Sequence, residues 1–259
     1  MKTLSVIVPS RAQPMQAAFL TRAIRSVANQ QSVQGDLQVE VIVGLDPHTA
    51  VPTLEALGVP VRFEMARTAS QASALNVAAA STEGEFLAIL EDDDIWQPHR
   101  LAPAMQALGS CDFVSCTQLE VDVSGSVIRI NDFATPSGWL MPRDIWLKVG
   151  PFDEQYRYHL DNEWLGRLDA SGARRLHLVE ATAPTSLEVA RQVRPWLANV
   201  LALGGSHVQL ARHRWMAPLV TRLVHAGSGM ARIMGDPVAT QTSASECGRL
   251  KERFGRIPW

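Results

Sequence analysis

The chain has 259 residues, of which 46% are hydrophobic and 19% are charged, and its net charge is −2. This composition belongs to folded globular proteins and excludes disordered and fibrous chains, and the low net charge argues against a dedicated nucleic-acid binder. Three cysteines without metal-ligand spacing indicate free thiols in a reducing compartment. Since neither a signal peptide nor an apolar run of about 18 residues is found, we expect a cytoplasmic protein.

Strands and helices are predicted in alternation over the first hundred residues. Such alternation indicates a parallel α/β sheet with helices on both faces. Ligands bind at the carboxyl ends of the strands of such sheets, so Ser10-Arg11, Asp46 and Glu91–Asp94 should meet in one crevice. The predicted elements are strands over 4–8, 39–43, 59–65 and 85–90 and helices over 19–30 and 72–80.

The rest of the chain is predicted to continue this pattern and to end in a mostly helical tail. The tail over 184–259 holds ten basic and four acidic residues, whereas residues 1–183 have a net charge of −8. Solvated helix faces explain a basic tail. Attraction to a phosphate-bearing ligand or to a membrane surface also explains it, which leaves peripheral contact with the inner face of the membrane open. The predicted elements are strands over 113–118 and on both sides of a turn at 124–126, and helices after 101, over 143–149 and over 161–170.

Four consecutive acidic residues, Glu91 to Asp94, follow a strongly apolar strand. Like charges this close raise each other's pKa unless a cation neutralises them. Oxygen ligands suit Mg²⁺ or Mn²⁺, which often complete their coordination with substrate phosphates. The alternative is an exposed acidic turn whose Asp94 caps the next helix. The chain lacks the glycine-rich loops that hold phosphates in P-loop and dinucleotide-binding proteins, so a nucleotide diphosphate here would need a metal ion.

The segments 4–10, 41–46 and 83–98 together resemble glycosyltransferase family 2. The most specific part is the run around Asp92–Asp94, and the resemblance covers roughly residues 3–170. It implies a GT-A fold, an α/β architecture in which a mixed nucleotide-binding sheet is flanked by helices. The implied domains are a catalytic domain over 1–183, divided into a nucleotide-sugar half over 1–101 and an acceptor half over 102–183, and a helical basic region over 184–259.

The resemblance also implies the residues of the donor site. Asp93 and Asp94 are similar to the metal-binding acids of the family. The chain departs from the family pattern at Glu91, which is one methylene longer than the usual aspartate, and at Leu45, which removes a polar contact. The residues implied to bind the nucleotide are Pro9, Ser10, Arg11, Asp46 (toward the base), Arg67, Asn76 and Asp92 (toward the ribose and diphosphate).

Another acid, Asp161, is the candidate catalytic base. Glycosyl transfer with inversion needs a carboxylate that removes the proton of the acceptor hydroxyl as this hydroxyl attacks the anomeric carbon. The run Gly150–Glu154 and the helix after it resemble the family's acceptor-side motif, in which the first acid of the helix is the base. Without the resemblance, Asp161 would be a plain helix N-cap. Glu163 competes for the role, but its i,i+4 spacing to Arg167 favours a surface ion pair.

Tryptophans and late histidines supply further candidates. Tryptophan stacks on sugar faces, so we predict that Trp139 and Trp164, near the acceptor-side motif, contact the acceptor; the alternative is core packing. Some GT-A enzymes use a late histidine as a metal ligand. The candidates for that role are His207, His213 and His225.

These expectations combine into an inverting glycosyltransferase of polysaccharide biosynthesis. It would move a sugar from a nucleotide diphosphate, with UDP as the first choice, to an acceptor hydroxyl, with Mn²⁺ or Mg²⁺ on the diphosphate. The acceptor is open among saccharides, lipid-linked and small molecules, no nucleic-acid partner is expected, and the oligomeric state is open. One alternative is a nucleotide-sugar-binding module without turnover. A second is a sugar-phosphate nucleotidyltransferase, which usually has a glycine-rich basic loop where this chain has residues 9–14 without glycine.

Overall fold

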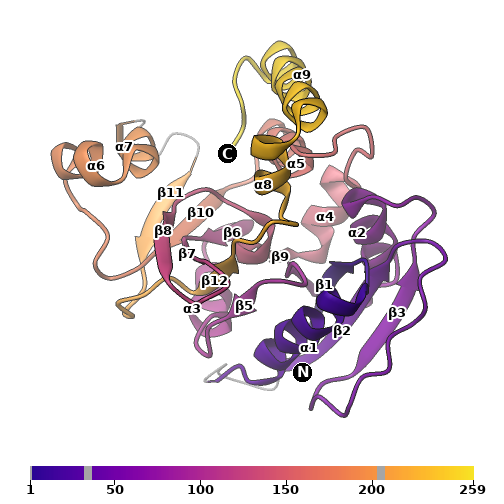
Figure 1. The fold of residues 1–259 in the computed structure, drawn as a ribbon. Coiled ribbons are helices and arrows are strands. Elements are labelled where there is room, and N and C mark those ends of the chain that lie inside the picture. The colour runs from indigo at the N-terminus through magenta and orange to yellow at the C-terminus, as the bar shows by residue number, and fades with distance from the viewer. Residues whose placement is uncertain (1, 32–36, 203–207) are drawn as a thin grey trace.

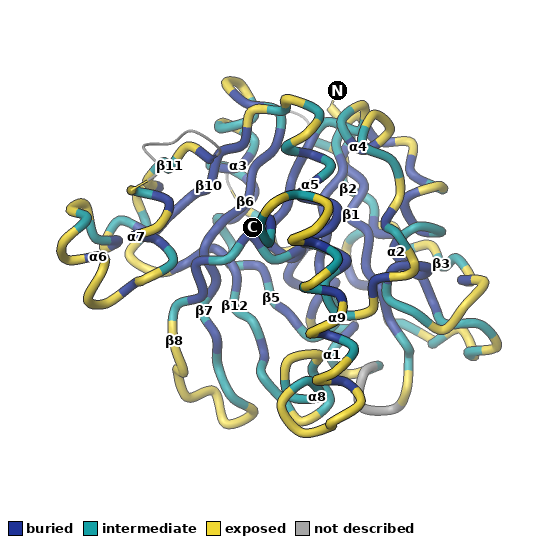
Figure 2. The backbone as a smooth tube through the Cα atoms, turned by 90° about the horizontal axis from the view of Figure 1, so that it is seen from above, coloured by how far each residue is buried: buried dark blue, intermediate teal, exposed yellow. Residues whose placement is uncertain are grey.

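The computed structural model describes residues 2–31, 37–202 and 208–259 and forms one large sheet with a smaller sheet beside it. Helices lie on both faces of the large sheet (Figure 1). The strands are the most buried part of the chain, and the exposed residues gather on helices and loops around them (Figure 2). Among the described helices, none combines the length and the hydropathy that a membrane crossing requires.

Parallel strands form the N-terminal half of the large sheet, as the sequence predicts. Hydrophobic residues alternate in the first strand, so that Leu4, Val6 and Val8 pack on one face of the sheet and Ile7 on the other. One helix covers each face, and all four strands end at the same edge of the sheet. The strands are β1 (Lys2–Ser10), β2 (Leu37–Leu45), β3 (Val61–Met65) and β4 (Phe86–Ile89), and the helices are α1 (Pro14–Ala28) and α2 (Gln71–Ala80).

The large sheet as a whole is mixed, and the parallel arrangement predicted from alternation applies to its N-terminal half. The strand Leu140–Pro142 lies between β4 and the strand Phe113–Cys116 and runs antiparallel to both. With three residues, this strand is too short to be predicted from its hydrophobic pattern. The mixed sheet agrees with the fold that the family resemblance implies. The further strands are β6 (Phe113–Cys116), β9 (Leu140–Pro142), β10 (Arg175–Val179) and β11 (Gln209–Arg212), and the order is β11-β10-β6-β9-β4-β1-β2-β3.

A smaller four-stranded sheet lies next to the carboxyl end of β4. The strand predicted over 113–118 is interrupted at Thr117, and its two parts belong to different sheets. Gly125, with φ 84°, makes the predicted turn between two of the strands. These strands are β5 (Ile95–Trp96), β7 (Gln118–Val121), β8 (Val127–Asn131) and β12 (Val220–Leu223), in the order β5-β12-β7-β8.

The tail over 184–259 is helical only in part. Two of its segments are strands, β11 at the edge of the large sheet and β12 inside the small one, so the tail completes both sheets. Its helices are α6 (Leu187–Val193), α7 (Pro195–Ala202), α8 (Gly229–Gly235) and α9 (Pro237–Phe254); the remaining helices are α3 (Leu101–Ala107), α4 (Arg143–Val149), α5 (Leu160–Ala170) and a 3-10 turn at Pro136–Gly138.

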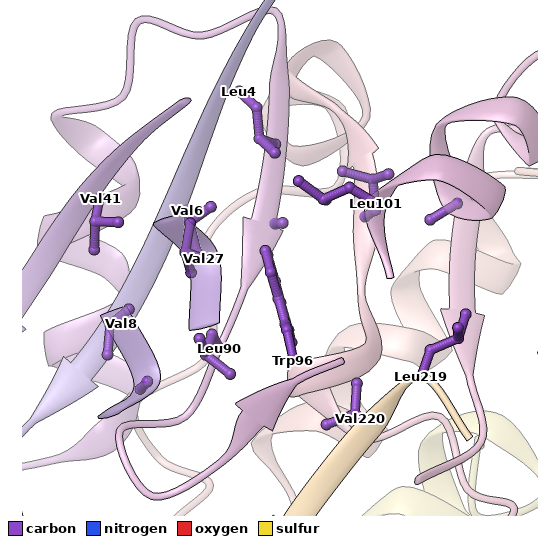
Figure 3. Packing of buried hydrophobic residues seen from close by; sticks show 14 of the residues in the cluster. Leu4, Val6, Val8, Val27, Val41, Leu90, Trp96, Leu101, Leu219 and Val220 are labelled. Atoms are coloured by element: carbon purple, nitrogen blue, oxygen red, sulfur yellow. The ribbon is translucent and has the colours of Figure 1, made fainter. Parts of the chain in front are cut away.

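The core has two main parts, one on each face of the large sheet. The first joins β1, β2 and α1 to the small sheet through Trp96 and Val220 (Figure 3). The second joins α2, α4 and α5 through Trp139 and Trp164. Each fully buried Leu, Val or Ile side chain contributes roughly 1.5–3 kcal/mol relative to exposure. The two packed faces therefore fix the edge of the sheet at which the acidic residues lie.

Candidate active site

The acidic residues 91–94 form a turn directly after β4. Because β4 ends at Ile89, strand alternation does not decide which of these side chains lie together. Carboxylate oxygens of Glu91, Asp93 and Asp94 lie within 4.8 Å of one another. Three acids at this distance offer the oxygen ligands that a divalent cation prefers. The sequence indicated Asp93 and Asp94 for this group but discounted Glu91.

Hydrogen bonds to distant parts of the chain hold this turn. The Ser137 hydroxyl donates to Asp94 Oδ2 at 2.6 Å and accepts from the Glu91 N–H at 3.0 Å. The N–H of Leu223, in β12, donates to Asp94 Oδ1 at 3.2 Å. Asp94 is therefore buried and supports the turn through both oxygens. It caps no helix, since α3 begins after Arg100, so the alternative of a helix-capping exposed turn does not hold.

Burial and mutual repulsion raise the pKa of the acids in the turn. Burial first and the Asp93 charge second raise the pKa of Asp92 from 3.8 to about 7 and also raise that of Asp94. Burial raises the pKa of Glu91 from 4.5 to about 6, with the charge of Arg222 acting against it. Without a cation these carboxylates are therefore costly to ionise, and a divalent ion would remove that cost.

Arg222 of β12 is a cation in this acidic environment that the sequence did not single out. It is the largest favourable charge on Glu91, and it also stabilises the ionised forms of Asp94 and Asp161. Its guanidinium lies 3.2 Å from Glu120 Oε1. No spacing motif connects Arg222 to the acidic turn. Only the insertion of β12 between β5 and β7 brings it there.

His225 is the late histidine that reaches the acidic turn. Its Nε2 lies 3.0 Å from Asp93 Oδ2, and its ring packs against Phe19 at 5.4 Å. The N–H of Gly227 donates to His225 Nδ1 at 3.1 Å, so Nδ1 is an acceptor and Nε2 carries the hydrogen that faces Asp93. His213 is buried away from this contact, and His207 lies outside the described residues.

The first loop and the acidic turn are in direct contact. The Ser10 hydroxyl donates to Asp92 Oδ2 at 2.6 Å. Asp92 is not a member of the three-acid group of Glu91, Asp93 and Asp94. The charge of Arg11 lowers the pKa of both Asp46 and Asp92, although burial raises each of them more. The Asp46 N–H donates to the Ser10 carbonyl at 3.3 Å. The loops at the strand ends thus meet, as predicted, around Ser10, Arg11, Asp46 and Asp92.

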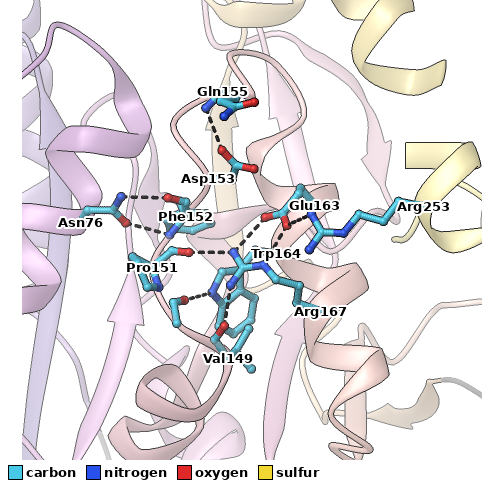
Figure 4. Close-up of polar contacts among 11 residues, drawn as sticks. Asn76, Val149, Pro151, Phe152, Asp153, Gln155, Glu163, Trp164, Arg167 and Arg253 are labelled. Atoms are coloured by element: carbon cyan, nitrogen blue, oxygen red, sulfur yellow. Dashed lines mark hydrogen bonds and ion pairs between the residues drawn. The ribbon is translucent and has the colours of Figure 1, made fainter. Parts of the chain in front are cut away.

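Three other residues predicted to bind the nucleotide have different surroundings. Pro9 is buried within β1, and Arg67 is exposed after β3. Asn76 exchanges two hydrogen bonds with the backbone of Phe152, at 2.9 and 2.8 Å (Figure 4). The Asn76 amide therefore holds the 150–154 loop against α2. Both of its polar atoms are already bonded to this loop, which argues against a contact with the nucleotide.

Asp161 is the second residue of α5. Burial raises the pKa of Asp161, and the charges of His159 and Arg222 act against this rise. The negative charge of Asp161 in turn raises the pKa of Glu91. The helix N-cap is His159, so the interpretation of Asp161 as an N-cap does not hold. The charge of the candidate base thus acts on one of the candidate metal ligands, Glu91.

Glu163 has the structural role that its spacing predicts. It pairs with Arg167 at 2.8 Å and with Arg253 of α9 at 2.8 Å (Figure 4). Arg167 also donates to the carbonyls of Val149 and Pro151, at 2.5 and 2.7 Å. The predicted ion pair is confirmed, but it is buried rather than at the surface, since Glu163 is 0% exposed.

Trp139 and Trp164 belong to the core, so their predicted contact with the acceptor is not supported. Both are 0% exposed, and their ring centroids lie 5.1 Å apart. Their indole N–H groups donate to the carbonyls of Ala134 and Gly150, at 2.7 and 2.9 Å. These two tryptophans are near the acceptor-side motif in sequence because they belong to the core in which α4 and α5 pack on the sheet.

Three arginines approach the same region from separate segments. Arg11 precedes α1, Arg157 precedes α5, and Arg232 lies on α8, a few residues after His225. Burial, followed by the positive charges of Arg11 and Arg157, lowers the pKa of Arg232. Like charges that remain this close favour an anionic ligand, which would reduce their repulsion.

Known proteins resemble this chain in sequence pattern and in fold. Residues 5–163 match the family described as Glycosyl transferase family 2. The crystal structure of S. aureus TarS is similar with TM-score 0.55 and 14% identity, covering 98% of this chain and 44% of TarS. TarS 1-349 in complex with UDP is similar with TM-score 0.55 and 14% identity, covering 98% of this chain and 72% of that structure. The complex of TarS 1-349 with UDP-GlcNAc has the same TM-score and identity, and the match covers 89% of this chain and 61% of that structure. At this identity the structures show a shared fold. No curated protein matches the chain in sequence.

Proposed function

The chain belongs to glycosyl transferase family 2 and is therefore a glycosyltransferase, and on that premise we propose its donor, its metal ion and its catalytic base. It transfers a sugar from a UDP-sugar to an acceptor hydroxyl with inversion at the anomeric carbon. One observation carries the proposal: three carboxylates lie within 4.8 Å of one another after β4, and the charge of Asp161 raises the pKa of one of them, Glu91. Metal ligands and base would then face one substrate.

Glu91, Asp93 and Asp94 would hold Mn²⁺ or Mg²⁺. Two observations support this fit. The three side chains offer the hard oxygen ligands that these ions prefer, and the raised pKa of Glu91 and Asp94 indicates that nearby positive charge does not offset the cost of ionising them. When bound, the ion supplies charge stabilisation for the departing diphosphate. His225 orients the Asp93 carboxylate through its Nε2–H, because the Gly227 N–H already occupies the other ring nitrogen.

Asp161 is the proposed general base. Its carboxylate accepts the proton of the acceptor hydroxyl while the hydroxyl oxygen forms a bond to the anomeric carbon. The bond from that carbon to the phosphate oxygen breaks, and its electron pair leaves with UDP. A carboxylate whose pKa is raised by burial is a stronger base than an exposed one, which suits this role.

The donor nucleotide would lie across the first loop. Asp46 accepts a hydrogen bond from the base, and Ser10 and Asp92 form the neighbouring pair toward the ribose. Arg11, Arg157 and Arg232 supply positive charge for the diphosphate or for an anionic acceptor. UDP is proposed because TarS structures of the same fold contain UDP and UDP-GlcNAc. Saccharides, lipid-linked molecules and small molecules all remain candidates for the acceptor, in the cytoplasm or at its membrane face.

Thermal stabilisation by nucleotides tests this proposal. UDP, GDP, dTDP and CDP are compared with and without Mn²⁺, and a ligand at 100 times its dissociation constant adds about 2.7 kcal/mol to the free energy of unfolding. We expect UDP to raise the melting temperature only with Mn²⁺, and D93N to remove that dependence. If none of the four stabilises the protein under either condition, the donor and metal assignments fail.

Turnover separates the proposal from its two alternatives. A binding module without turnover would be stabilised by UDP and Mn²⁺ but would release no UDP from UDP-sugars in the presence of acceptors. A nucleotidyltransferase would instead form a nucleotide sugar from a sugar phosphate and a nucleoside triphosphate. The first loop argues against that activity, because Ser10 and Arg11 are followed by Ala12 without a glycine-rich run.

A further inference from the structure

One carboxylate of the C-terminal helix holds the loop that precedes Asp161. Glu246 of α9 is 1% exposed and accepts hydrogen bonds from three successive backbone N–H groups. The Arg157 N–H donates to Oε1 at 2.7 Å, and those of Tyr158 and His159 donate to Oε2 at 2.9 and 3.0 Å. Successive N–H groups that converge in this way form an anion-binding concavity. Here the anion is a side chain of the protein itself.

The partners of Glu246 differ from those of most buried carboxylates. Glu163 and Glu180, also buried, each pair with an arginine. Among the salt bridges of the described residues none includes Glu246, so its partners are backbone groups. Hydrogen bonds from N–H groups to an ionised carboxylate are among the stronger ones in proteins. Glu246 therefore fixes a path of the main chain.

A second contact from α9 reaches the same loop. His159, the N-cap residue of α5, has its Nδ1 2.9 Å from Asn162 Oδ1 and its Nε2 2.8 Å from the hydroxyl of Ser243. Both the backbone and the ring of His159 are thus held by α9. Since α5 begins at the next residue, these contacts determine where its first turn lies, and Asp161 is in that turn.

The rest of α9 packs along α5, so it is a firm support for this loop. Arg253 pairs with Glu163 at 2.8 Å, and the Asn162 amide donates to the Pro258 carbonyl at 2.7 Å. Phe254 lies against Gly166, where an added Cβ would approach its ring to 2.6 Å. In Figure 1, α9 lies beside α5.

We propose that Glu246 is a positioning residue for glycosyl transfer, which sets the place of the Asp161 carboxylate through the backbone of residues 157–159. The proposal rests on the role proposed above for Asp161. Glu246 lies outside the family-matched segment 5–163, so the base belongs to that segment while its support comes from the tail. A base displaced by about 1 Å loses roughly 10²-fold in rate, because transfer requires it within hydrogen-bond reach of the hydroxyl.

The test compares E246Q with E252Q in the full chain. Both residues are on α9, but Glu252 is exposed, so E252Q controls for loss of a carboxylate from this helix. Three quantities are measured: UDP release from UDP-GlcNAc with Mn²⁺ and water as acceptor, calorimetric affinity for UDP, and amide hydrogen exchange at 157–159. For E246Q we expect kcat to fall about 10–100-fold and exchange at 157–159 to accelerate. UDP affinity should fall less than kcat does, because Arg157 is only one of three arginines proposed near the diphosphate.

A double variant distinguishes positioning from general destabilisation. If Glu246 acts through Asp161, E246Q causes no further loss of turnover in a D161N background. Turnover of E246Q equal to that of E252Q, or a full further loss in D161N, would overturn the proposal. If E246Q does not fold, E246D keeps the charge while withdrawing the oxygens by one methylene, and the same outcomes decide.

The failure of this proposal differs from failure of the proposed function. Full UDP release by D161N alone contradicts the base assignment, and with it the proposed role of Glu246. An inactive D161N together with an unaffected E246Q contradicts only the role of Glu246. If the wild-type protein releases no UDP from UDP-GlcNAc, this UDP-sugar is excluded as the donor. Unchanged exchange at 157–159 in E246Q would then separately refute the support of that loop.

Discussion

The acids of the turn after β4 differ in their partners, and these partners separate their roles. Asp92 accepts a hydrogen bond from Ser10, Asp93 faces His225, and Asp94 is bonded to Ser137 and to the backbone of β12. Glu91 accepts a hydrogen bond from Gln71 at 2.6 Å. One additional methylene gives Glu91 the reach to join the group with Asp93 and Asp94. The departure from the usual aspartate is therefore compatible with a metal site.

The substitution D161N tests the base at the residue scale. Asparagine keeps the shape of the side chain but cannot accept the proton, so we expect transfer to fall by about 10²–10⁴-fold. Stabilisation by UDP with Mn²⁺ should not fall below the wild-type level, because Asp161 is not a proposed ligand of either and loss of its charge favours the ionised form of Glu91. Rates of UDP release and melting temperatures measure the two effects. Unchanged transfer in D161N would move the role to another carboxylate.

The pH dependence of metal binding follows from the raised pKa values. Between about pH 4 and 7 the folded protein holds protons on Glu91 and Asp92 that the unfolded chain has lost, so stability without metal falls as pH rises. A metal ion needs the deprotonated carboxylates, so its binding releases protons and strengthens over the same range. We expect the Mn²⁺-dependent part of the UDP-induced melting shift to grow from about pH 5.5 to about 7.5. A shift that is constant with pH would contradict the assignment of these carboxylates.

Two contacts between elements align the site: α2 on β2, and β12 between β5 and β7. Gly44 in β2 allows α2 to pack directly on the strand, since a Cβ there would lie 1.9 Å from the Ala74 carbonyl oxygen. The first residue of α2, Gln71, then reaches Glu91. The strand β12 places Arg222 among the acids and leads to His225. Both contacts join segments that are distant in sequence.

The substitution G44A tests the packing of α2 at the element scale. The added methyl group would force α2 away from β2, and overpacking of this kind costs typically 1–3 kcal/mol or more. We expect a lower melting temperature and weaker Mn²⁺-dependent stabilisation by UDP, because Gln71 moves with α2. Thermal melts with and without UDP and Mn²⁺ measure both effects.

The variant G248A is the matched control for G44A. Gly248 lies in α9, and no described atom outside its own helical turns lies within 4 Å of the position that a Cβ would take there. Alanine at this position should therefore be neutral or slightly stabilising. A melting temperature of G44A that equals that of G248A would show that the close approach of α2 to β2 is relaxed without cost.

At the scale of the whole molecule, the tail belongs to the same folded body as residues 1–183. It supplies β11 to one sheet and β12 to the other, and α9 supports α5. Arg194 of the tail forms a buried ion pair with Glu180 at 2.6 Å and another with Asp132. Removing one partner of a buried pair typically costs about 3–5 kcal/mol. The domain boundary expected at residue 183 therefore lies between segments that are joined by strand pairing and by buried ion pairs.

Truncation after residue 183 tests this at the molecular scale. The fragment 1–183 would lose two strands and leave Glu180 and Asp132 without Arg194, so we expect it to lack a cooperative thermal transition. Circular dichroism and size-exclusion chromatography of the fragment, beside the full chain, measure this outcome. A soluble fragment that melts cooperatively at the temperature of the full chain would instead support a separate domain over 1–183.

Local information in the chain was enough to predict the N-terminal architecture and the nature of the acidic turn. Alternating strands and helices, inferred from hydrophobic periodicity, predicted β1 to β4 with α1 and α2 and placed the loops of the candidate site at one edge. The motifs around Asp92–Asp94 and Gly150–Glu154 predicted the family, because their residues are adjacent in the chain. Local patterns and contiguous motifs need no knowledge of distant contacts.

Which side chains meet was settled by the folded arrangement and not by any local pattern. Trp139 and Trp164 were expected at the acceptor but are buried, and Asn76 holds a loop, since sequence position does not report which face of an element is covered. Arg222 and His225 come to the acidic turn through strand pairing and a contact between segments more than a hundred residues apart. Glu246 holds the backbone of residues 157–159 through the packing of α9 on α5. No periodicity or spacing encodes such contacts. They follow from the way in which the tail completes both sheets.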